Sequence, residues 1–218
     1  MQLPRDFSTP PTALDHFRRL LVLDEVLLTG QALRDVIVFD FNGAQPASGA
    51  LGGTTKAADT QTYPYSAGLD LSMTVVNLKP CGINTPHIHP RAAELLILIE
   101  GSNVRFGSIV ENGLVKPGEN QEIAGVLNRF EMTAFSQGSM HYQFNDGCQD
   151  AVLVAALGSG NPGTNQMTNL FHLNSGVVNT TLGAPSSIDG SNVDEFRKSI
   201  PANLAQDVKS CLARCGPR

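Results

Sequence analysis

Three of the five histidines in this chain lie in two short clusters whose spacing could hold a metal ion. In the first cluster, His87 and His89 stand two positions apart, so on a β-strand their side chains point to the same face. Glu94 follows after a proline-led bend, and a returning strand can bring its carboxylate to that face. His141 opens the second cluster. Three imidazoles and one carboxylate are a good ligand set for one divalent ion, such as manganese, iron, nickel or zinc.

The expected metal would keep room for a substrate. Four protein ligands in a six-coordinate site leave about two positions open, and a catalytic metal needs such positions. A divalent cation beside a single carboxylate keeps a net positive charge, which favours an anion. The predicted partner is therefore a small anion, such as a carboxylate, or an oxygen species, such as superoxide. The simpler alternative makes the clustered histidines ordinary polar residues at strand ends. The remaining two, His16 and His172, are expected to be structural or surface residues.

Composition and turn spacing indicate the scaffold that carries these residues. Charged residues make up only 16% of the chain, and 21 glycines and 13 prolines favour a turn-rich β protein over a helical bundle. Short strands are expected at close intervals, separated by Gly, Pro, Asn and Asp, which is typical of a sandwich or barrel. The expected strands are 70–79, 93–99, 103–109, 121–126, 129–135, 141–145 and 151–157.

The two ends of the chain differ from this middle part. The N-terminal part predicts a helix over 12–29, a strand over 36–41 and a loop or edge segment over 43–61. The C-terminal part predicts short helices over 175–182, 193–199 and 202–215. The expected organisation is an N-terminal helical arm (1–35), a β-barrel (36–160) and a helical C-terminal extension (161–218).

Charge and hydropathy argue against some partners. The formal net charge is −5 and no long basic run occurs, so nucleic acid is not expected as a partner. No apolar stretch reaches the roughly 18–20 residues of a membrane span. The chain opens without the apolar segment of a signal peptide, so it is either cytoplasmic or secreted after removal of a leader. Four cysteines, an even number, and the sequon at Asn179 favour the secreted location.

The two clusters together resemble the two motif boxes of germins. Residues 81–94, followed by Gly101, are similar to the first box, G-x5-H-x-H-x(3,4)-E-x6-G. Gly138, His141 and Asn145 are similar to the second box, G-x5-P-x-G-x2-H-x3-N. The resemblance runs from about Val38 to the C-terminus and is strongest to the fungal and slime-mould germin-like proteins related to spherulin. The sequence departs from the boxes at three positions, none of them a ligand: Cys81, Phe130 and Ser136.

This resemblance implies a fold, a metal and an activity. The fold would be all-β: a single jelly-roll cupin barrel with an N-terminal arm and a helical C-terminal extension. One divalent ion per chain would bind to His87, His89, Glu94 and His141, with manganese as first choice and iron as second. Oxalate-oxidising germins use two asparagines near the metal; Asn84 matches one of them, and Thr74 stands at the other position. Glu94 and Asn84 are therefore the predicted catalytic residues.

The family precedents for activity are superoxide dismutation and oxalate oxidation, which predicts a metal-dependent oxidoreductase. Two alternatives stay open. The protein is either a non-catalytic stress, storage or cell-wall protein whose metal stabilises the barrel, or an enzyme that modifies a larger metabolite under a long loop at 43–65. The resemblance also implies a homo-oligomer, because germins pair their barrels and clasp neighbours with C-terminal helices. The apolar residues expected to need such cover are Phe196, Ile200, Leu204 and Val208.

A disulfide prediction follows from the cupin resemblance. In a cupin, the strand with two histidines runs antiparallel beside the strand with the third, and antiparallel partners keep a nearly constant sum of residue numbers. The pair Cys81 and Cys148 has nearly the same sum as the pair His87 and His141. A Cys81–Cys148 bridge is therefore expected, with Cys211–Cys215 as a second bridge. The alternative is four buried thiols in a cytoplasmic protein.

Overall fold

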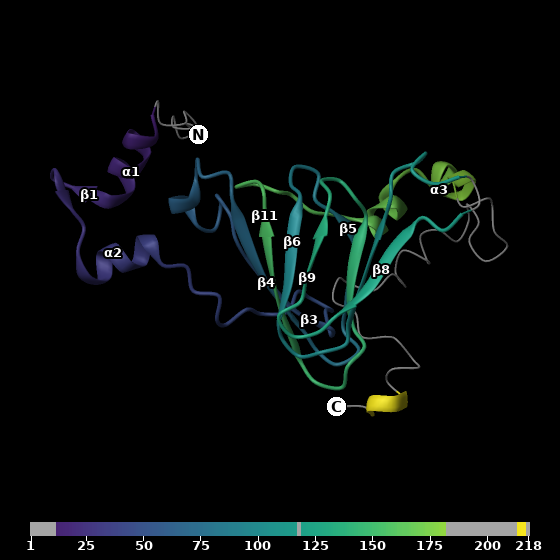
Figure 1. Ribbon diagram of the computed structural model, residues 1–218. Coiled ribbons are helices and arrows are strands. Elements are labelled where there is room, and N and C mark those ends of the chain that lie inside the picture. Colours follow the sequence, from purple (N-terminus) through teal and green to yellow (C-terminus); the bar gives the residue numbers. More distant parts are fainter. Residues whose placement is uncertain (1–11, 117–118, 182–212, 217–218) are drawn as a thin grey trace.

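Two five-stranded antiparallel sheets form the body of the protein (Figure 1). The computed structural model describes residues 12–116, 119–181 and 213–216. One sheet has the strand order β3-β4-β11-β6-β9 and the other the order β12-β5-β10-β7-β8. The strands are β3 (Gly53–Ala58), β4 (Ser72–Leu78), β5 (Ile83–Ile88), β6 (Glu94–Glu100), β7 (Val104–Ile109), β8 (Glu122–Leu127), β9 (Met132–Phe135), β10 (His141–Asn145), β11 (Ala151–Leu157) and β12 (Asn165–Gln166). The all-β barrel expected from the sequence is confirmed.

The core lies between the two sheets because alternate residues of each strand point inward. In the register of the first sheet, Leu153 of β11 stands opposite Val76 of β4 and Leu98 of β6. All three side chains are buried and belong to one apolar cluster. Leu96 and Leu157 extend this cluster to the end of the barrel at which Glu94 begins β6. The packed core therefore supports the strand ends that carry the candidate ligands.

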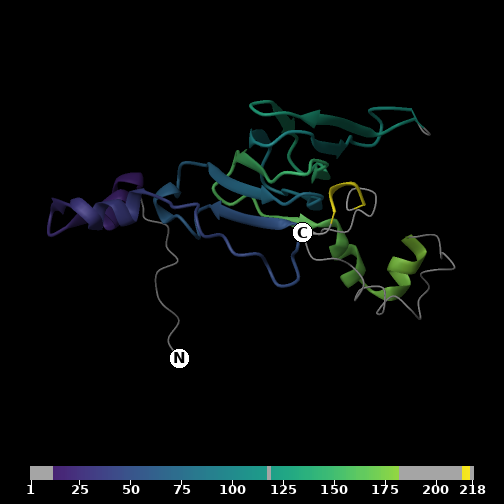
Figure 2. The same ribbon diagram turned by 90° about the horizontal axis from the view of Figure 1, so that it is seen from below.

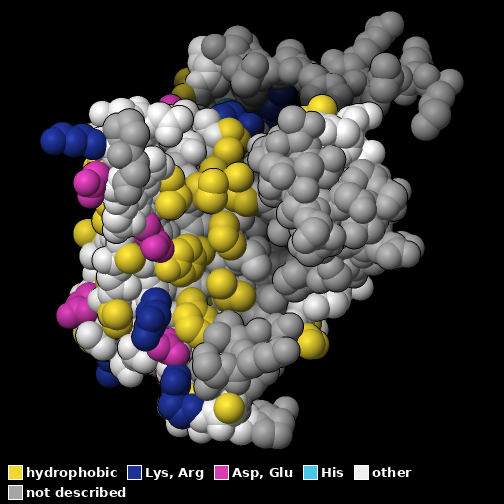
Figure 3. Space-filling model, turned by 90° about the vertical axis from the view of Figure 1, so that its right-hand side faces the viewer, with side chains coloured by type: hydrophobic (Ala, Val, Ile, Leu, Met, Phe, Trp, Pro, Cys, Tyr) yellow, Lys and Arg dark blue, Asp and Glu magenta, His cyan; other side chains and the backbone are white. Residues whose placement is uncertain are grey.

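Both sheets also carry apolar residues on their outer faces. Strands β6 and β11 are almost continuously apolar, a pattern typical of strands that are covered on both sides. On the outer face of the β3-β4-β11-β6-β9 sheet, the side chains of Met73, Leu95 and Met132 are 42%, 48% and 58% exposed. A second band of hydrophobic side chains lies on the side of the molecule where β5 and β8 are drawn in Figure 1 (Figure 3).

Two of the positions at which the sequence departs from the germin boxes lie in turns. Cys81 and Phe130 stand where the boxes have a glycine, and both have left-handed backbone angles, with φ of 61° and 67°. Glycine adopts this conformation without steric cost, whereas other residues rarely do. Cys81 ends the turn before β5, and Phe130 ends the turn before β9. The backbone of the boxes is therefore kept although the glycines are not.

The N-terminal part forms an arm beside the barrel (Figures 1 and 2). Its elements are α1 (Ala13–Leu21), β1 (Val22–Leu23), β2 (Val26–Leu27) and α2 (Gly30–Ile37). The helix predicted over 12–29 is confirmed over Ala13–Leu21 and wrong beyond it, because Asp24 and Glu25 take positive φ angles and turn the chain into a hairpin. The strand predicted over 36–41 is also wrong, because α2 continues to Ile37 and no strand follows it there.

The remaining elements lie after the last long strand. They are η2 (Met167–His172) and α3 (Ser175–Thr181), and α3 confirms the helix predicted from residue 175. The helix predicted over 193–199 and most of the one over 202–215 fall outside the described residues.

The segment expected as a loop or edge segment over 43–61 contains the edge strand β3, and a short 3-10 helix, η1 (Pro64–Ser66), follows it. Within the described residues, no helix has the length and apolarity needed to cross a lipid bilayer.

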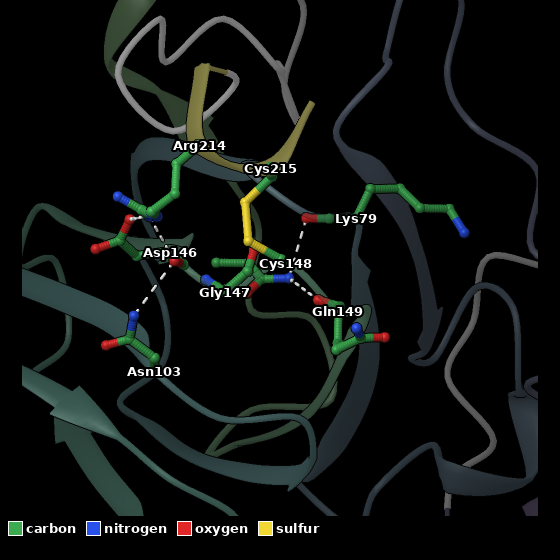
Figure 4. The surroundings of a disulfide bond; sticks show 9 residues. Lys79, Asn103, Asp146, Gly147, Cys148, Gln149, Arg214 and Cys215 are labelled. Atoms are coloured by element: carbon green, nitrogen blue, oxygen red, sulfur yellow. Dashed lines mark hydrogen bonds and ion pairs between the residues drawn. A yellow bond between two sulfur atoms is a disulfide. The ribbon is translucent and has the colours of Figure 1, made fainter. Parts of the chain in front are cut away.

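The predicted disulfide pairing is wrong. Cys148 is bonded to Cys215, with a Cα–Cα distance of 5.4 Å, which excludes both the Cys81–Cys148 and the Cys211–Cys215 bridges (Figure 4). The register between β5 and β10 shifts after His141, and the backbone N–H of Cys81 donates to the carbonyl of Asn145 instead of facing Cys148. Cys81 is also disulfide-bonded, while Cys211 lies outside the described residues.

The bridge fixes the residues before the C-terminus to the turn between β10 and β11. Arg214 reinforces this attachment, because its guanidinium lies 2.6 Å from an Asp146 carboxylate oxygen (Figure 4). Arg105 of β7 contacts the other oxygen of the same carboxylate at 2.8 Å. The cysteines that the structure describes are all oxidised, so the alternative of free thiols does not apply to them.

Candidate metal centre

The structure brings the four predicted ligands together at one end of the barrel interior. His87 lies on β5, Glu94 begins β6 and His141 begins β10, while His89 follows the end of β5. His87 and His141 are direct partners in the β5–β10 register. One ligand atom from each of the four residues lies within 4.8 Å of the others. The group could therefore hold a single metal ion.

Backbone carbonyls fix the orientation of all three imidazoles. The Nδ1 atom of His87 lies 2.8 Å from the Thr85 carbonyl, and that of His141 lies 2.8 Å from the Ser139 carbonyl. The Nδ1 atom of His89 lies 2.6 Å from the carbonyl of Gly163. Because a carbonyl can only accept, each Nδ1 carries a proton, so in the neutral ring it is Nε2 that has the lone pair for a metal ion. This is the support that metal-binding histidines commonly have.

The carbonyl that orients His89 is itself held in position. Arg91 donates from Nε to the Asn161 carbonyl at 2.7 Å and from Nη2 to the Asn161 side chain at 2.9 Å. These bonds fix the loop that presents Gly163 to His89. Arg91 therefore braces a loop behind the metal centre.

Glu94 supplies the negative charge of the site. Its Oε2 lies 3.0 Å from His89 Nε2, and the side chain is 4% exposed. Burial raises the pKa of Glu94, but the neighbouring imidazoles of His141 and His89 outweigh it and lower the pKa to about 2. Burial and the neighbouring His141 lower the pKa of His87 to about 4. Burial lowers the pKa of His89 as well, but the bonds to Glu94 and Gly163 outweigh it, so this pKa is raised.

One atom of the site lacks a partner that a metal ion would supply. His141 Nε2 is buried and makes no hydrogen bond, since its nearest charged neighbour, Glu94 Oε2, is 3.5 Å away. Leaving a buried polar atom unsatisfied costs about 1–3 kcal/mol. A divalent cation among the four side chains would satisfy this nitrogen and neutralise Glu94. The residues present therefore fit a divalent metal ion.

A buried pair of amide side chains lies next to the ligands on the same two strands. Asn84 of β5 donates from Nδ2 to Gln143 Oε1 of β10 at 2.7 Å. Gln143 is 1% exposed, and its Nε2 has no partner. Gln143 was missed from the sequence, although it stands two positions after His141 and so shares its inward face. The structure thus makes Asn84 the residue that orients Gln143.

Asn145, two positions further along β10, has a structural role. Its Nδ2 lies within 2.7–3.2 Å of the carbonyls of Leu78, Lys79 and Gln149. Its Oδ1 accepts from the N–H of Gly147 at 3.0 Å. The asparagine of the second box therefore ties neighbouring segments together at the end of β10 opposite His141.

Comparisons with known proteins agree with this geometry. The protein-family model described as Cupin matches residues 39–194. Spherulin-1A of Physarum polycephalum is 31% identical over 217 residues, which cover 98% of this chain and 82% of the relative. Putative germin-like protein 2-1 of Oryza sativa subsp. japonica is 34% identical over 171 residues, covering 75% of this chain and 76% of the relative.

Among solved structures, recombinant oxalate oxidase in complex with glycolate has a TM-score of 0.61 and 25% sequence identity. The match covers 76% of this chain and 83% of the oxalate oxidase chain. The long family match, the relatives and the grouped His87, His89, Glu94 and His141 lead to the same result. The chain belongs to the cupin family, among the relatives of the spherulins and germin-like proteins.

Proposed function

We propose that this protein is a mononuclear metal-dependent oxidoreductase of the germin-like class that acts on a small carboxylate or an oxygen species. The observation that carries the proposal is the group of three histidines and Glu94, in which a backbone carbonyl holds the Nδ1 atom of each imidazole and leaves Nε2 for a metal ion. One divalent ion per chain would bind there, with manganese as first choice and iron as second. When bound, such an ion supplies Lewis acidity and one-electron redox capacity.

The side chains around the metal ligands suit a carboxylate. The ligand set contains one anionic group, so a divalent site keeps a positive charge for an anionic substrate. Gln143 Nε2 is buried, unpaired and able to donate to a substrate oxygen. Asn84 holds the acceptor end of Gln143, and Phe135 stacks on His141 with a centroid distance of 4.3 Å. The similarity to an oxalate oxidase solved with glycolate supports a carboxylate substrate.

The test is an assay of metal-replete protein against oxalate, superoxide and a panel of dicarboxylates, with Glu94→Ala as the inactive reference. In this assay, we expect Gln143→Leu to lower kcat/KM for the carboxylate substrate about tenfold to a hundredfold, because one buried hydrogen-bond donor to the substrate is lost. Metal content should stay at the wild-type level. The matched control is Gln121→Leu, an exposed glutamine between β7 and β8, which should leave both values unchanged.

Wild-type activity equal to that of Glu94→Ala on every compound would contradict an enzymatic role. That result would favour the second candidate, a stress, storage or cell-wall protein in which the metal stabilises the barrel. The 31% sequence identity with Spherulin-1A, which extends over 98% of this chain, favours this alternative over other non-catalytic roles. In that case, a chelator would still lower the unfolding temperature of the metal-loaded protein, because a ligand that binds only the folded state stabilises it.

A homo-oligomer is part of the proposal. The exposed apolar residues on the outer face of the β3-β4-β11-β6-β9 sheet support it, and so does the hydrophobic band on the other side of the molecule (Figure 3). The C-terminal residues that led to this expectation lie outside the described part of the chain. Light scattering at micromolar concentration should give at least twice the chain mass of 23.2 kDa. A particle of a single chain mass would contradict the proposal.

Secretion is the proposed location, with the cytoplasm as the alternative. The Cys148–Cys215 bridge supports it, because disulfides persist in oxidising compartments and are rare in the cytosol. Peptide mapping of protein from its native source under non-reducing conditions tests this point. Recovery of Cys148 as a free thiol would contradict the location.

A further inference from the structure

A cavity of about 920 Å³ is lined by residues next to His141, although none of the four candidate ligands lines it. Its walls come from β7, β8, β9 and the connection that leads into β10, together with residues 109–114. Ser108 lines the cavity and is the direct partner of His141 in the β7–β10 register. Met140, the residue before His141, lines it as well. The cavity is therefore lined by direct neighbours of one candidate ligand, His141.

The lining is almost uncharged and combines apolar with polar side chains. Phe106, Ile123 and Met140 supply ring and aliphatic surface, and Ser108 and Thr133 supply hydroxyl groups. Of the described residues that line the cavity, only Glu111 is charged, and it is acidic. The described lining therefore offers no cationic side chain that could pair with the second carboxylate of a dicarboxylate such as oxalate. A ligand pocket typically measures about 300–1,000 Å³, so this cavity has the size for a ligand much larger than oxalate.

A polar atom in the cavity wall also lacks a partner. The hydroxyl of Ser139 is buried and makes no hydrogen bond, and Ser139 lines the cavity two positions before His141. Gln143 Nε2 is likewise unpaired, and Gln143 stands opposite Phe106 of the cavity wall in the β7–β10 register. Two unsatisfied donors near the ligands, next to a cavity whose wall includes Phe106, Ile123 and Met140, suit a molecule with a polar end and an apolar body.

We propose that the site takes a monocarboxylate that carries an apolar group of about the size of an aromatic ring. This inference rests on the proposed function, because the carboxylate end would lie at the open positions of the metal. The apolar body would lie against Phe106, Ile123 and Met140. The loop at 43–65, expected from the sequence to cap a larger pocket, contributes none of the residues that line this cavity.

Glycolate and mandelate test the proposal, because they share a hydroxycarboxylate end and differ by one phenyl ring. Isothermal titration of both mandelate enantiomers and of glycolate into manganese-loaded protein should give at least about tenfold tighter binding for one mandelate enantiomer, because its ring is removed from water. Ile123→Trp, which fills the cavity from β8, should bring the ratio of the two affinities close to one. Ala124→Trp, on the exposed outer side of the same strand, should keep the ratio of the wild type.

Equal affinities for glycolate and mandelate in the manganese-loaded wild type would overturn this inference and leave the proposed function standing. A preference for mandelate that survives removal of the metal would also overturn it, because the ring site would then be independent of the metal. Absence of metal-dependent binding of either carboxylate would overturn the inference and the proposed function together. A ratio that stays high in Ile123→Trp would show that the ring lies outside this cavity.

Discussion

His87→Ala is expected to bind a divalent metal at least about a hundredfold more weakly than the wild type and to lose most of its metal during purification. The substitution removes one of four ligand atoms and leaves an ion with two histidines and Glu94. The protein should still fold, because His87 lies near the end of β5 and outside the apolar cluster of the core. Elemental analysis of the purified variant, with a metal titration followed by calorimetry, measures the effect.

His172→Ala is the matched control for this experiment. His172 lies at the end of η2, is exposed, and is not one of the grouped ligands. This variant should keep about one equivalent of metal per chain, as the wild type should. If His87→Ala kept the full metal content, the ion would have to bind elsewhere, and the assignment of the four ligands would be wrong.

Loss of the Cys148–Cys215 bridge is expected to have the largest effect on stability. The two cysteines are 67 residues apart, and the chain-entropy model gives about 4 kcal/mol for closing a loop of this length in the unfolded state. The double variant Cys148→Ala, Cys215→Ala avoids a leftover thiol that could exchange with another disulfide. Its free energy of unfolding should therefore be about 4 kcal/mol lower in urea denaturation at equilibrium.

Arg214→Ala separates the bridge from the ion pair next to it. The Arg214 side chain is 55% exposed, and Asp146, which is 12% exposed, keeps its ion pair with Arg105, so loss of Arg214 should cost about 1 kcal/mol or less. Both variants should keep their metal, because none of the four candidate ligands lies in the bridged segment. A double variant as stable as Arg214→Ala would contradict the stabilising role of the bridge.

The candidate ligands could be predicted from the sequence because the chemistry is concentrated in two short segments. Strand alternation alone puts His87 and His89 on one face, and it would have put Gln143 on the face of His141. Gln143 was missed because a single glutamine on a strand gives no signal by itself. Its importance depends on Asn84, which lies 59 residues away in the sequence and pairs with it only in the folded barrel.

The disulfide could not be predicted in the same way, because two facts of the tertiary structure decide it. The register of β5 and β10 shifts between His141 and Gln143, so the ladder does not continue to Cys81 and Cys148. The segment at 213–216 then lies against the turn that contains Cys148, which no local pattern indicates. Likewise, the break after α1 depends on positive φ angles at Asp24 and Glu25; aspartate tolerates this conformation, but glutamate gives no such signal in the sequence.

The most direct test of the metal centre is the relaxation rate of water protons in a solution of manganese-loaded protein, before and after addition of oxalate. We expect the rate per manganese ion to rise above that of the free aqueous ion, because a protein-bound ion tumbles more slowly and so relaxes the water at its open positions more efficiently. Oxalate should then lower the rate by taking those positions from water. A rate equal to that of free manganese, or a raised rate that no carboxylate changes, would contradict an open metal site on His87, His89, Glu94 and His141.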